Sequence, residues 1–176
     1  MFLYTFLFLT GLNSQAMQIV QQLAADLEAL QSGECWIGYN ANEILDDIDF
    51  ETAQWRSHEK GNSIWQLVNH ISFWREVVAA RLNSRKYAPT EKTGLEDIIV
   101  VDAQAWHEAK SHFEEASRRL HKAILNFDND RLLDLLDSRA GTYYYNITGL
   151  IQHDAFHLGQ IMLLKRMASE IKKDEQ

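Results

Sequence analysis

The amino-acid sequence predicts an all-α protein folded as one four-helix bundle, with a long crossover connection and short additional helices. The chain of 176 residues contains one proline, Pro89, and no stretch alternates apolar and polar residues as a half-buried strand would. Several long segments instead repeat apolar residues at intervals of three and four, which is typical of amphipathic helices. Because 46% of the residues are apolar, the chain can bury one sizeable core. We therefore expect a single bundle domain over residues 17–176.

Residues 1–16, MFLYTFLFLTGLNSQA, are predicted to be an apolar extension that precedes this domain. The run resembles the apolar centre of a signal peptide, but no Lys or Arg precedes it and it is too short to span a bilayer. Three interpretations stay open: an extension packed on the domain or on a neighbouring chain, a signal, and a native helix turn. We expect no membrane partner.

Local signals predict the helix boundaries in the first half of the chain. The first helix is predicted over about residues 17–31, and Gly33 ends it. The connection that follows contains a short helix around residues 42–47 and the acidic turn DDIDFE. Ser63 is predicted as the N-cap of the second long helix, which continues to about Leu82. The residues expected to face the core are Ile19, Leu23, Leu27 and Leu30 in the first helix, and Ile64, Leu67, Val68, Ile71, Trp74 and Val78 in the second.

Local signals also predict the elements in the second half of the chain. Residues 83–94, NSRKYAPTEKTG, carry the proline and a glycine and are predicted to form the long connection. Asp102 is predicted to cap a third helix that ends near Asn126, and one short helix is expected over residues 130–138. The last helix is predicted over residues 143–172, about 45 Å long. Its residues expected to face the core are Ile147, Leu150, Ile151, Leu158, Ile161 and Leu164.

The charge distribution disfavours a nucleic-acid partner. The formal net charge is −8, and the first 55 residues contain eight Asp and Glu but no Lys or Arg. The basic clusters at residues 118–122 and 165–166 lie among acidic neighbours, as on a solvated helix face. The single cysteine, Cys35, allows no internal disulfide, which fits a reducing compartment such as the cytoplasm. We expect Cys35 to be a small buried hydrophobe.

Three histidines are candidate metal ligands. His153 and His157, in GLIQHDAFHLGQI, lie four positions apart, so both imidazoles face the same side of a helix. His70 lies on the inner side of another predicted helix, and three imidazoles around one ion would leave a coordination position open, as in catalytic zinc sites. The alternative is that they are core histidines hydrogen-bonded to carbonyls or to Asp154. The remaining four, expected at the surface, are His58, His107, His112 and His121.

Two passages carry a resemblance to a known family. GNSIWQLVNHISFWREVVAARLN has a histidine in the middle of an apolar helix, and YNITGLIQHDAFHLGQIMLLKR has His-x-x-x-His followed by Gly-Gln-Ile. With Trp36, Gly38 and Trp55, the chain resembles the DinB-like bundle proteins, which are mostly bacterial metal-binding four-helix domains. The resemblance covers roughly residues 17–172.

The resemblance implies a metal site and leaves the reaction open. It implies that His70, His153 and His157 bind one divalent metal ion, most simply zinc or nickel, although iron, manganese or copper also suit such ligands. Some members resemble thiol S-transferases that use low-molecular-weight thiols, and others are related to metal-dependent hydrolases or isomerases. A homodimer is a further expectation from the family.

Two hypotheses of different classes follow. In the first, the protein is a metal-dependent enzyme with a small-molecule substrate: an S-transferase that activates a low-molecular-weight thiol, or a hydrolase that activates water. In the second, the ion fixes two helices around a pocket that binds a ligand without transforming it. The aromatic residues considered for that pocket are Trp65, Trp74, Tyr143, Tyr144 and Tyr145. Most of them are more simply core or rim residues, because aromatic residues at helical spacing usually pack.

Overall fold

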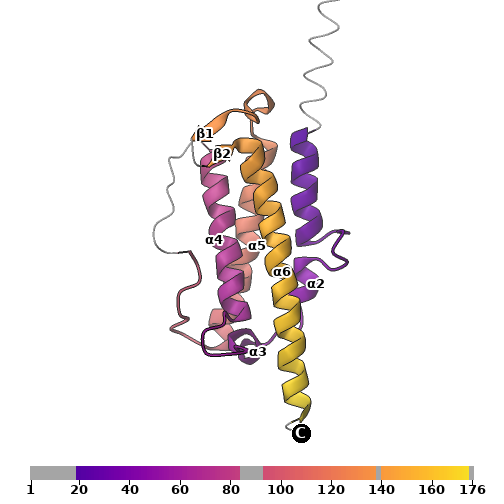
Figure 1. Cartoon of the computed structure of the whole chain (residues 1–176), viewed down its shortest axis with the longest axis vertical. Coiled ribbons are helices and arrows are strands. Elements are labelled where there is room, and N and C mark those ends of the chain that lie inside the picture. Colours follow the sequence, from indigo (N-terminus) through magenta and orange to yellow (C-terminus); the bar gives the residue numbers. More distant parts are fainter. Residues whose placement is uncertain (1–18, 84–92, 138–139, 175–176) are drawn as a thin grey trace, which may run out of the picture.

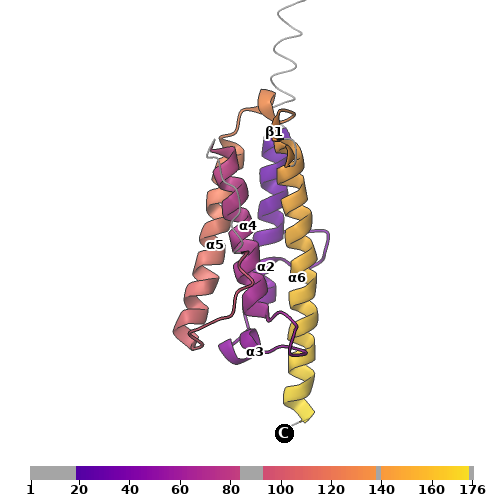
Figure 2. The same ribbon diagram turned by 60° about the vertical axis from the view of Figure 1, so that its left-hand side comes forward.

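The computed structural model describes residues 19–83, 93–137 and 140–174. Its four long helices are that of residues 19–31, α4 (Ile64–Leu82), α5 (Ala103–Leu125) and α6 (Tyr143–Asp174). Figures 1 and 2 show them packed lengthwise as one bundle, with α6 extending past the others at its C-terminal end. The predicted all-α bundle is confirmed.

Two predicted segments lie where the structure gives no description. The apolar extension, residues 1–16, and most of the predicted crossover, residues 84–92, lie outside the described residues. They remain predictions.

The predicted N-caps of α4 and α5 are confirmed. Ser63 forms a capping box with Gln66: the Ser63 hydroxyl accepts from the Gln66 amide, and the Gln66 side chain accepts from the Ser63 amide. At α5 the Asp102 carboxylate accepts from the amide of Ala105. Each cap satisfies backbone donors that have no partner within the helix, which explains why these boundaries follow from short sequence patterns.

Two short helices connect the first long helix to α4. The predicted one is confirmed as α2 (Ala41–Leu45), which Asn40 caps. The acidic turn predicted next to it is wrong in part, because α3 (Phe50–Gln54) begins there. The Asp49 carboxylate accepts from the amide of Thr52, so the last aspartate of that acidic run is an N-cap.

The short helix predicted over residues 130–138 is wrong. A single 3-10 turn, Asn129–Arg131, occupies its start, and β1 (Leu135–Asp137) then pairs antiparallel with β2 (Gly141–Thr142). Gly141 has a φ of 76°, a left-handed conformation that glycine adopts at little cost. Pairing with β2 satisfies backbone groups that a helix of this length would leave free, so a local hairpin forms where the periodic pattern predicts a helix.

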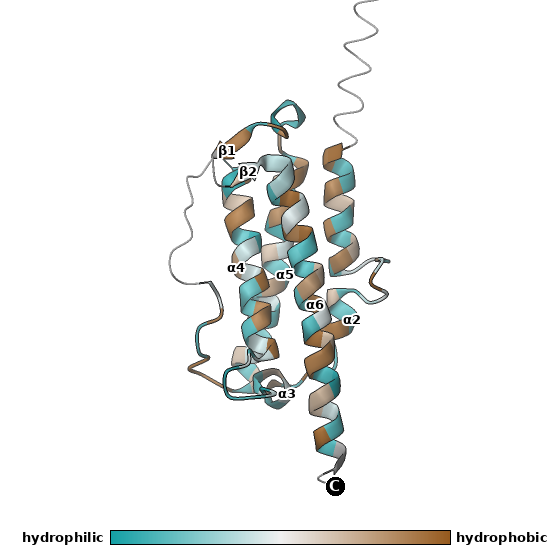
Figure 3. Ribbon diagram, in the orientation of Figure 1, coloured by the Kyte–Doolittle hydropathy of each residue, from teal (hydrophilic) through white to brown (hydrophobic). Residues whose placement is uncertain are grey.

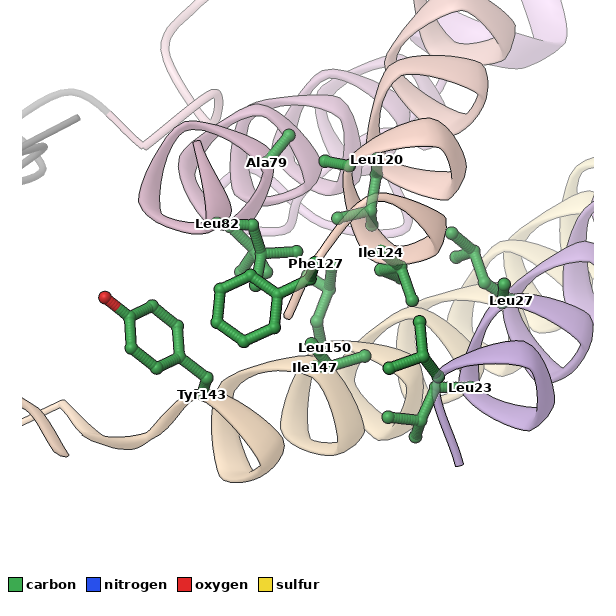
Figure 4. Close-up of a cluster of buried hydrophobic side chains, with 14 of the residues drawn as sticks. Leu23, Leu27, Ala79, Leu82, Leu120, Ile124, Phe127, Tyr143, Ile147 and Leu150 are labelled. Carbon is green, nitrogen blue, oxygen red and sulfur yellow. The ribbon is translucent and has the colours of Figure 1, made fainter. Parts of the chain in front are cut away.

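The core consists of two apolar clusters, one above the other along the bundle. Figure 3 shows apolar and polar residues alternating along the helices, and the buried apolar ones form these clusters. Figure 4 shows the cluster nearer the strands, where Leu23, Leu27, Leu120, Ile124 and Ile147 come together. The second cluster, toward the other end, contains Leu30, Ala41, Ile44, Leu45, Ile48, Ala53, Ile64, Trp65, Leu67, Val68, Ile71, Trp106, Phe113, Leu158 and Ile161.

Two predicted core positions are corrected. Ile19 is 45% exposed, and the neighbouring Val20 takes its place inside. Cys35 is half-buried, and its thiol donates to the carbonyl of Tyr39 over 3.2 Å. Ile19 lies at the start of the first long helix, where the periodic pattern includes the fewest neighbours, and Cys35 lies in the connection between that helix and α2. Among the described residues, no helix is both long and apolar enough to cross a membrane.

Replacing Leu120 with Ala is expected to lower the free energy of unfolding by about 2–5 kcal/mol, because the side chain is fully buried and its removal leaves a cavity. Leu125→Ala is the matched control, since Leu125 is on the same helix and 47% exposed. It is expected to change stability by about 0.5 kcal/mol or less. Urea unfolding followed by circular dichroism measures both, and equal losses would contradict this placement of the core.

Candidate metal centre

Three imidazoles from two helices converge at one side of the bundle. His70 comes from α4, and His153 and His157 come from successive turns of α6. One potential ligand atom of each lies within 4.8 Å of the others. The Nε2 atoms of His70 and His153 are 3.1 Å apart. In the part of the chain that the structure describes, no other group of three His, Cys, Asp or Glu side chains has this geometry.

The second nitrogen of each ring has its own acceptor. The carbonyl of Thr93 lies 2.6 Å from His70 Nδ1, and Gln160 Oε1 lies 2.7 Å from His157 Nδ1. Asp154 Oδ1 is 3.4 Å from His153 Nδ1. A carbonyl can only accept, so the proton of neutral His70 is on Nδ1.

The same hydrogen bonds direct lone pairs into the site. A proton on Nδ1 leaves the Nε2 atom of His70 as an acceptor, and the Asp154 carboxylate favours the same arrangement at His153. Two acceptor nitrogens at 3.1 Å repel each other unless a cation lies between or beside them. The three residues therefore fit a divalent metal ion, with their Nδ1 partners as the usual supporting hydrogen bonds.

Burial keeps two of the imidazoles in the neutral form that binds metals. Burial lowers the pKa of His70, although the hydrogen bond to the Thr93 carbonyl opposes this effect. Burial also lowers the pKa of His157, and the hydrogen bond to Gln160 opposes it. A nearby positive charge on His153 would lower both further. Both rings therefore stay available as ligands below the pH at which an exposed histidine becomes protonated.

The loop before α5 reaches His70 by packing closely on α4. Gly94 has a φ of 83°, and a Cβ atom there would lie 2.6 Å from the carbonyl oxygen of Asn69. The Glu96 carboxylate accepts from the amides of Thr93 and Gly94 at 2.8 and 3.0 Å. Only glycine combines this conformation with this approach, so Gly94 allows the Thr93 carbonyl to contact the imidazole.

A fully buried ion pair lies directly behind the histidines. Arg75 Nε donates to Asp154 Oδ2 over 2.7 Å, and neither side chain is exposed to solvent. Arg75 Nη1 donates to Gln31 Oε1 over 2.8 Å and to the Phe113 carbonyl over 3.3 Å. One guanidinium thus links α4 to the three other long helices.

Sequence reasoning missed Arg75. The available signal was a charged residue within an otherwise apolar helical stretch, SFWREVV, because an arginine there must either leave the core or find buried partners. Its partners are distant in sequence, so the pattern alone does not identify them.

Aromatic side chains border the histidines. The Trp74 ring is edge-on to His70 and to His153, with centroids 6.3 Å apart in each case. The ring of Phe156, a residue 63% exposed, lies 5.1 Å from that of His157. The candidate centre therefore opens to solvent between apolar surfaces.

The other aromatic residues considered for a pocket lie elsewhere. Trp65 is buried against Trp106, with centroids 5.2 Å apart, and Tyr143 packs on Phe127 in the other apolar cluster. Tyr144 and Tyr145 are exposed. Of the five candidates, only Trp74 contacts the histidines, and the others are core or surface residues, as expected for most of them.

The remaining histidines lie away from the centre. His58, His107 and His112 are exposed, as predicted. His121 is half-buried, and its Nε2 lies 3.2 Å from Glu28 Oε2. The structure thus brings together the three histidines that the sequence singled out and separates the four that it placed at the surface.

The described chain is an all-helical bundle with a three-histidine group that could hold a metal ion. A family model described as the DinB superfamily matches residues 38–161. The match covers more than half of the chain and includes all three histidines, so the chain belongs to the DinB superfamily. Comparison with curated proteins and with solved structures gives no match.

Arg75→Met is expected to lower the free energy of unfolding by about 3–5 kcal/mol, because it leaves the buried Asp154 carboxylate without its partner. The double variant Arg75→Met, Asp154→Leu removes both charges and should regain much of that loss. Arg118→Met, which disrupts exposed ion pairs on α5, should cost about 1 kcal/mol or less. Chemical denaturation of the three variants measures these differences. A double variant no more stable than Arg75→Met would contradict the argument.

The stability of metal-free protein is expected to fall in mild acid. Because burial lowers the pKa of His70 and His157 in the folded chain, the unfolded chain takes up these protons at higher pH. The contribution of neutral His70 and His157 to folding stability is therefore complete above the ordinary His pKa, about 6.5. It is lost as the pH falls toward the lowered pKa values of the folded chain. Urea denaturation in the presence of a chelator, at a series of pH values, measures this slope. It should become shallower in the double variant His70→Gln, His157→Gln, and an unchanged slope would contradict the assignment.

Proposed function

We propose that the protein binds one divalent metal ion through His70, His153 and His157 and transfers a low-molecular-weight thiol to an electrophilic small molecule. The observation that carries the proposal is the convergence of three imidazoles whose Nδ1 atoms each have a hydrogen-bond acceptor. Membership of the DinB superfamily supports it.

The donor set supports this chemistry. Three neutral imidazoles suit zinc or nickel best, and iron, manganese or copper are also compatible. An ion held by three protein ligands keeps coordination positions open and lowers the pKa of a thiol or a water molecule that occupies one of them.

The residues around the histidines have distinct roles in the proposed reaction. Thr93, Gln160 and Asp154 hold the three rings in orientation through Nδ1. Trp74 and Phe156 border the site with apolar surface, which favours a soft sulfur atom and an apolar electrophile. In the transfer, the thiol proton leaves to solvent, the sulfur forms a bond to the electrophilic carbon, and the leaving group departs with the electron pair of the broken bond.

A thiol substrate suits the site better than water for one reason. Free water has a pKa of about 15.7, so an ion must lower it by many units before hydroxide forms at neutral pH. A thiol has an ordinary pKa near that of cysteine, about 8.5, so coordination alone can supply the thiolate at neutral pH. Hydrolysis and ligand binding without turnover are the alternatives that the experiment must separate.

Purified protein without an affinity tag is expected to contain close to one metal ion per chain by elemental analysis. The double variant His153→Ala, His157→Ala should contain close to none, because it loses two of three ligands. The matched control is His107→Ala, His112→Ala, which removes two exposed histidines from α5. Circular dichroism of all three should show similar helix content.

The same preparations test the reaction. Consumption of thiol with an alkylating electrophile, seen in the native protein and the control but not in the site variant, is the expected result. Ester hydrolysis without thiol consumption would favour the hydrolase, and bound metal with neither reaction would favour a binding module. Native protein that stays free of metal even after incubation with zinc or nickel would exclude the proposal.

A further inference from the structure

The face that carries the histidines continues along the bundle to Arg81 and Asn146. Arg81 lies eleven residues after His70 on α4, and Asn146 lies seven residues before His153 on α6. Both separations are close to whole numbers of helical turns, so these residues share the helix faces of the histidines. Arg81 Nη1 donates to Asn146 Oδ1 over 2.7 Å. This contact places the guanidinium about two turns, roughly 10 Å, from His153 along α6.

The protein fixes the orientation of this guanidinium. Asn146 is 9% exposed, and its amide nitrogen donates to the carbonyls of Ala140 and Thr142 at 2.7 and 2.8 Å. Both amide donors are therefore used, and the Asn146 carbonyl oxygen is directed at Arg81. Backbone carbonyls of the hairpin before α6 therefore hold Asn146, and Asn146 in turn orients the Arg81 guanidinium. The hairpin that replaces the predicted helix thus has a role in positioning this cation.

The charge of Arg81 has no counter-ion among the described residues. Each of the other described arginines has a carboxylate within 4.0 Å: Arg56, Arg75, Arg118, Arg119, Arg131 and Arg166. Arg81 has only the neutral Asn146, and its Nε is buried without a hydrogen-bond partner. A partly desolvated guanidinium in this state is costly, and an anion that binds to it lowers that cost.

There is space beside α6 between the two positions. Gly149 lies four residues before His153, on the same face of the helix. Apart from its two chain neighbours and the nearby backbone of α6, a Cβ atom at Gly149 would meet no atom within 4 Å. With no side chain at this position, an extended ligand can lie along α6 from the histidines toward Arg81.

We propose that Arg81 binds a carboxylate of the substrate, so that the thiol used by this protein carries an anionic group about 10 Å from its sulfur. This inference rests on the proposed function, because it takes the sulfur to bind at the histidines. It narrows the substrate from small thiols in general to acidic thiols that can span the distance. Arg81 is the specificity-determining residue.

Glutathione and its diethyl ester are matched probes, because they have the same thiol and differ in whether the carboxylates are charged. Protein loaded with Co(II) reports thiolate coordination by its charge-transfer absorption in the near ultraviolet. Native protein is expected to bind glutathione more tightly than the ester. Arg81→Met should lower the affinity for glutathione about ten- to a hundredfold, as expected for the loss of a charge-assisted hydrogen bond. It should leave the affinity for the ester unchanged. Arg81→Lys should retain part of the preference.

Arg118→Met, an exposed arginine on α5, is the control and should bind both probes as the native protein does. Thermal melting of each variant tests whether it is folded. If native protein binds acid and ester equally, or if Arg81→Met weakens both equally, the Arg81 inference is wrong and the proposed function stands. If neither thiol gives a charge-transfer band, the proposed function fails and this inference fails with it.

Discussion

One buried guanidinium, that of Arg75, joins all four long helices of the bundle. It donates to Asp154 on α6, to Gln31 on the first long helix and to the Phe113 carbonyl on α5. A buried ion pair adds little stability over an apolar replacement, but any packing that separates its members leaves a charge unpaired in the core. The bundle is therefore restricted to arrangements in which all four helices meet this one side chain. Because Asp154 follows His153 directly, the same restriction fixes the rotation of α6 that directs His153 and His157 toward α4.

This polar layer lies between the two apolar clusters of the core. Burying charged groups is unfavourable unless they are fully paired, and the clusters on either side supply the apolar burial that offsets the cost. The candidate metal centre occupies the same level of the bundle at its solvent side. The imidazoles thus have a rigid interior behind them and open surface in front, an arrangement suited to binding an ion and a small molecule together.

Only part of the candidate site could be predicted from the sequence. The pairing of His153 with His157 follows from their spacing on one helix, and the addition of His70 followed from the pattern of α4 and the family resemblance. The acceptors at Nδ1 could not be predicted in the same way. The Thr93 carbonyl is a backbone atom 23 residues from His70, and its contact requires the close approach of Gly94 to α4. Arg81 looked like any basic residue near a helix end, because its missing counter-ion is a property of the folded chain.

Local sequence patterns are enough to predict the helical class, the caps at Ser63 and Asp102 and the common face of His153 and His157. These features depend on interactions among residues within a few positions of one another, which a short pattern records. Tertiary packing alone sets the ion pair of Arg75 with Asp154 and the meeting of His70 with His153. These contacts join residues 79 and 83 positions apart, respectively. Such contacts are selected by the packing of whole helices, so the tertiary structure converts three separate histidines into one candidate metal centre.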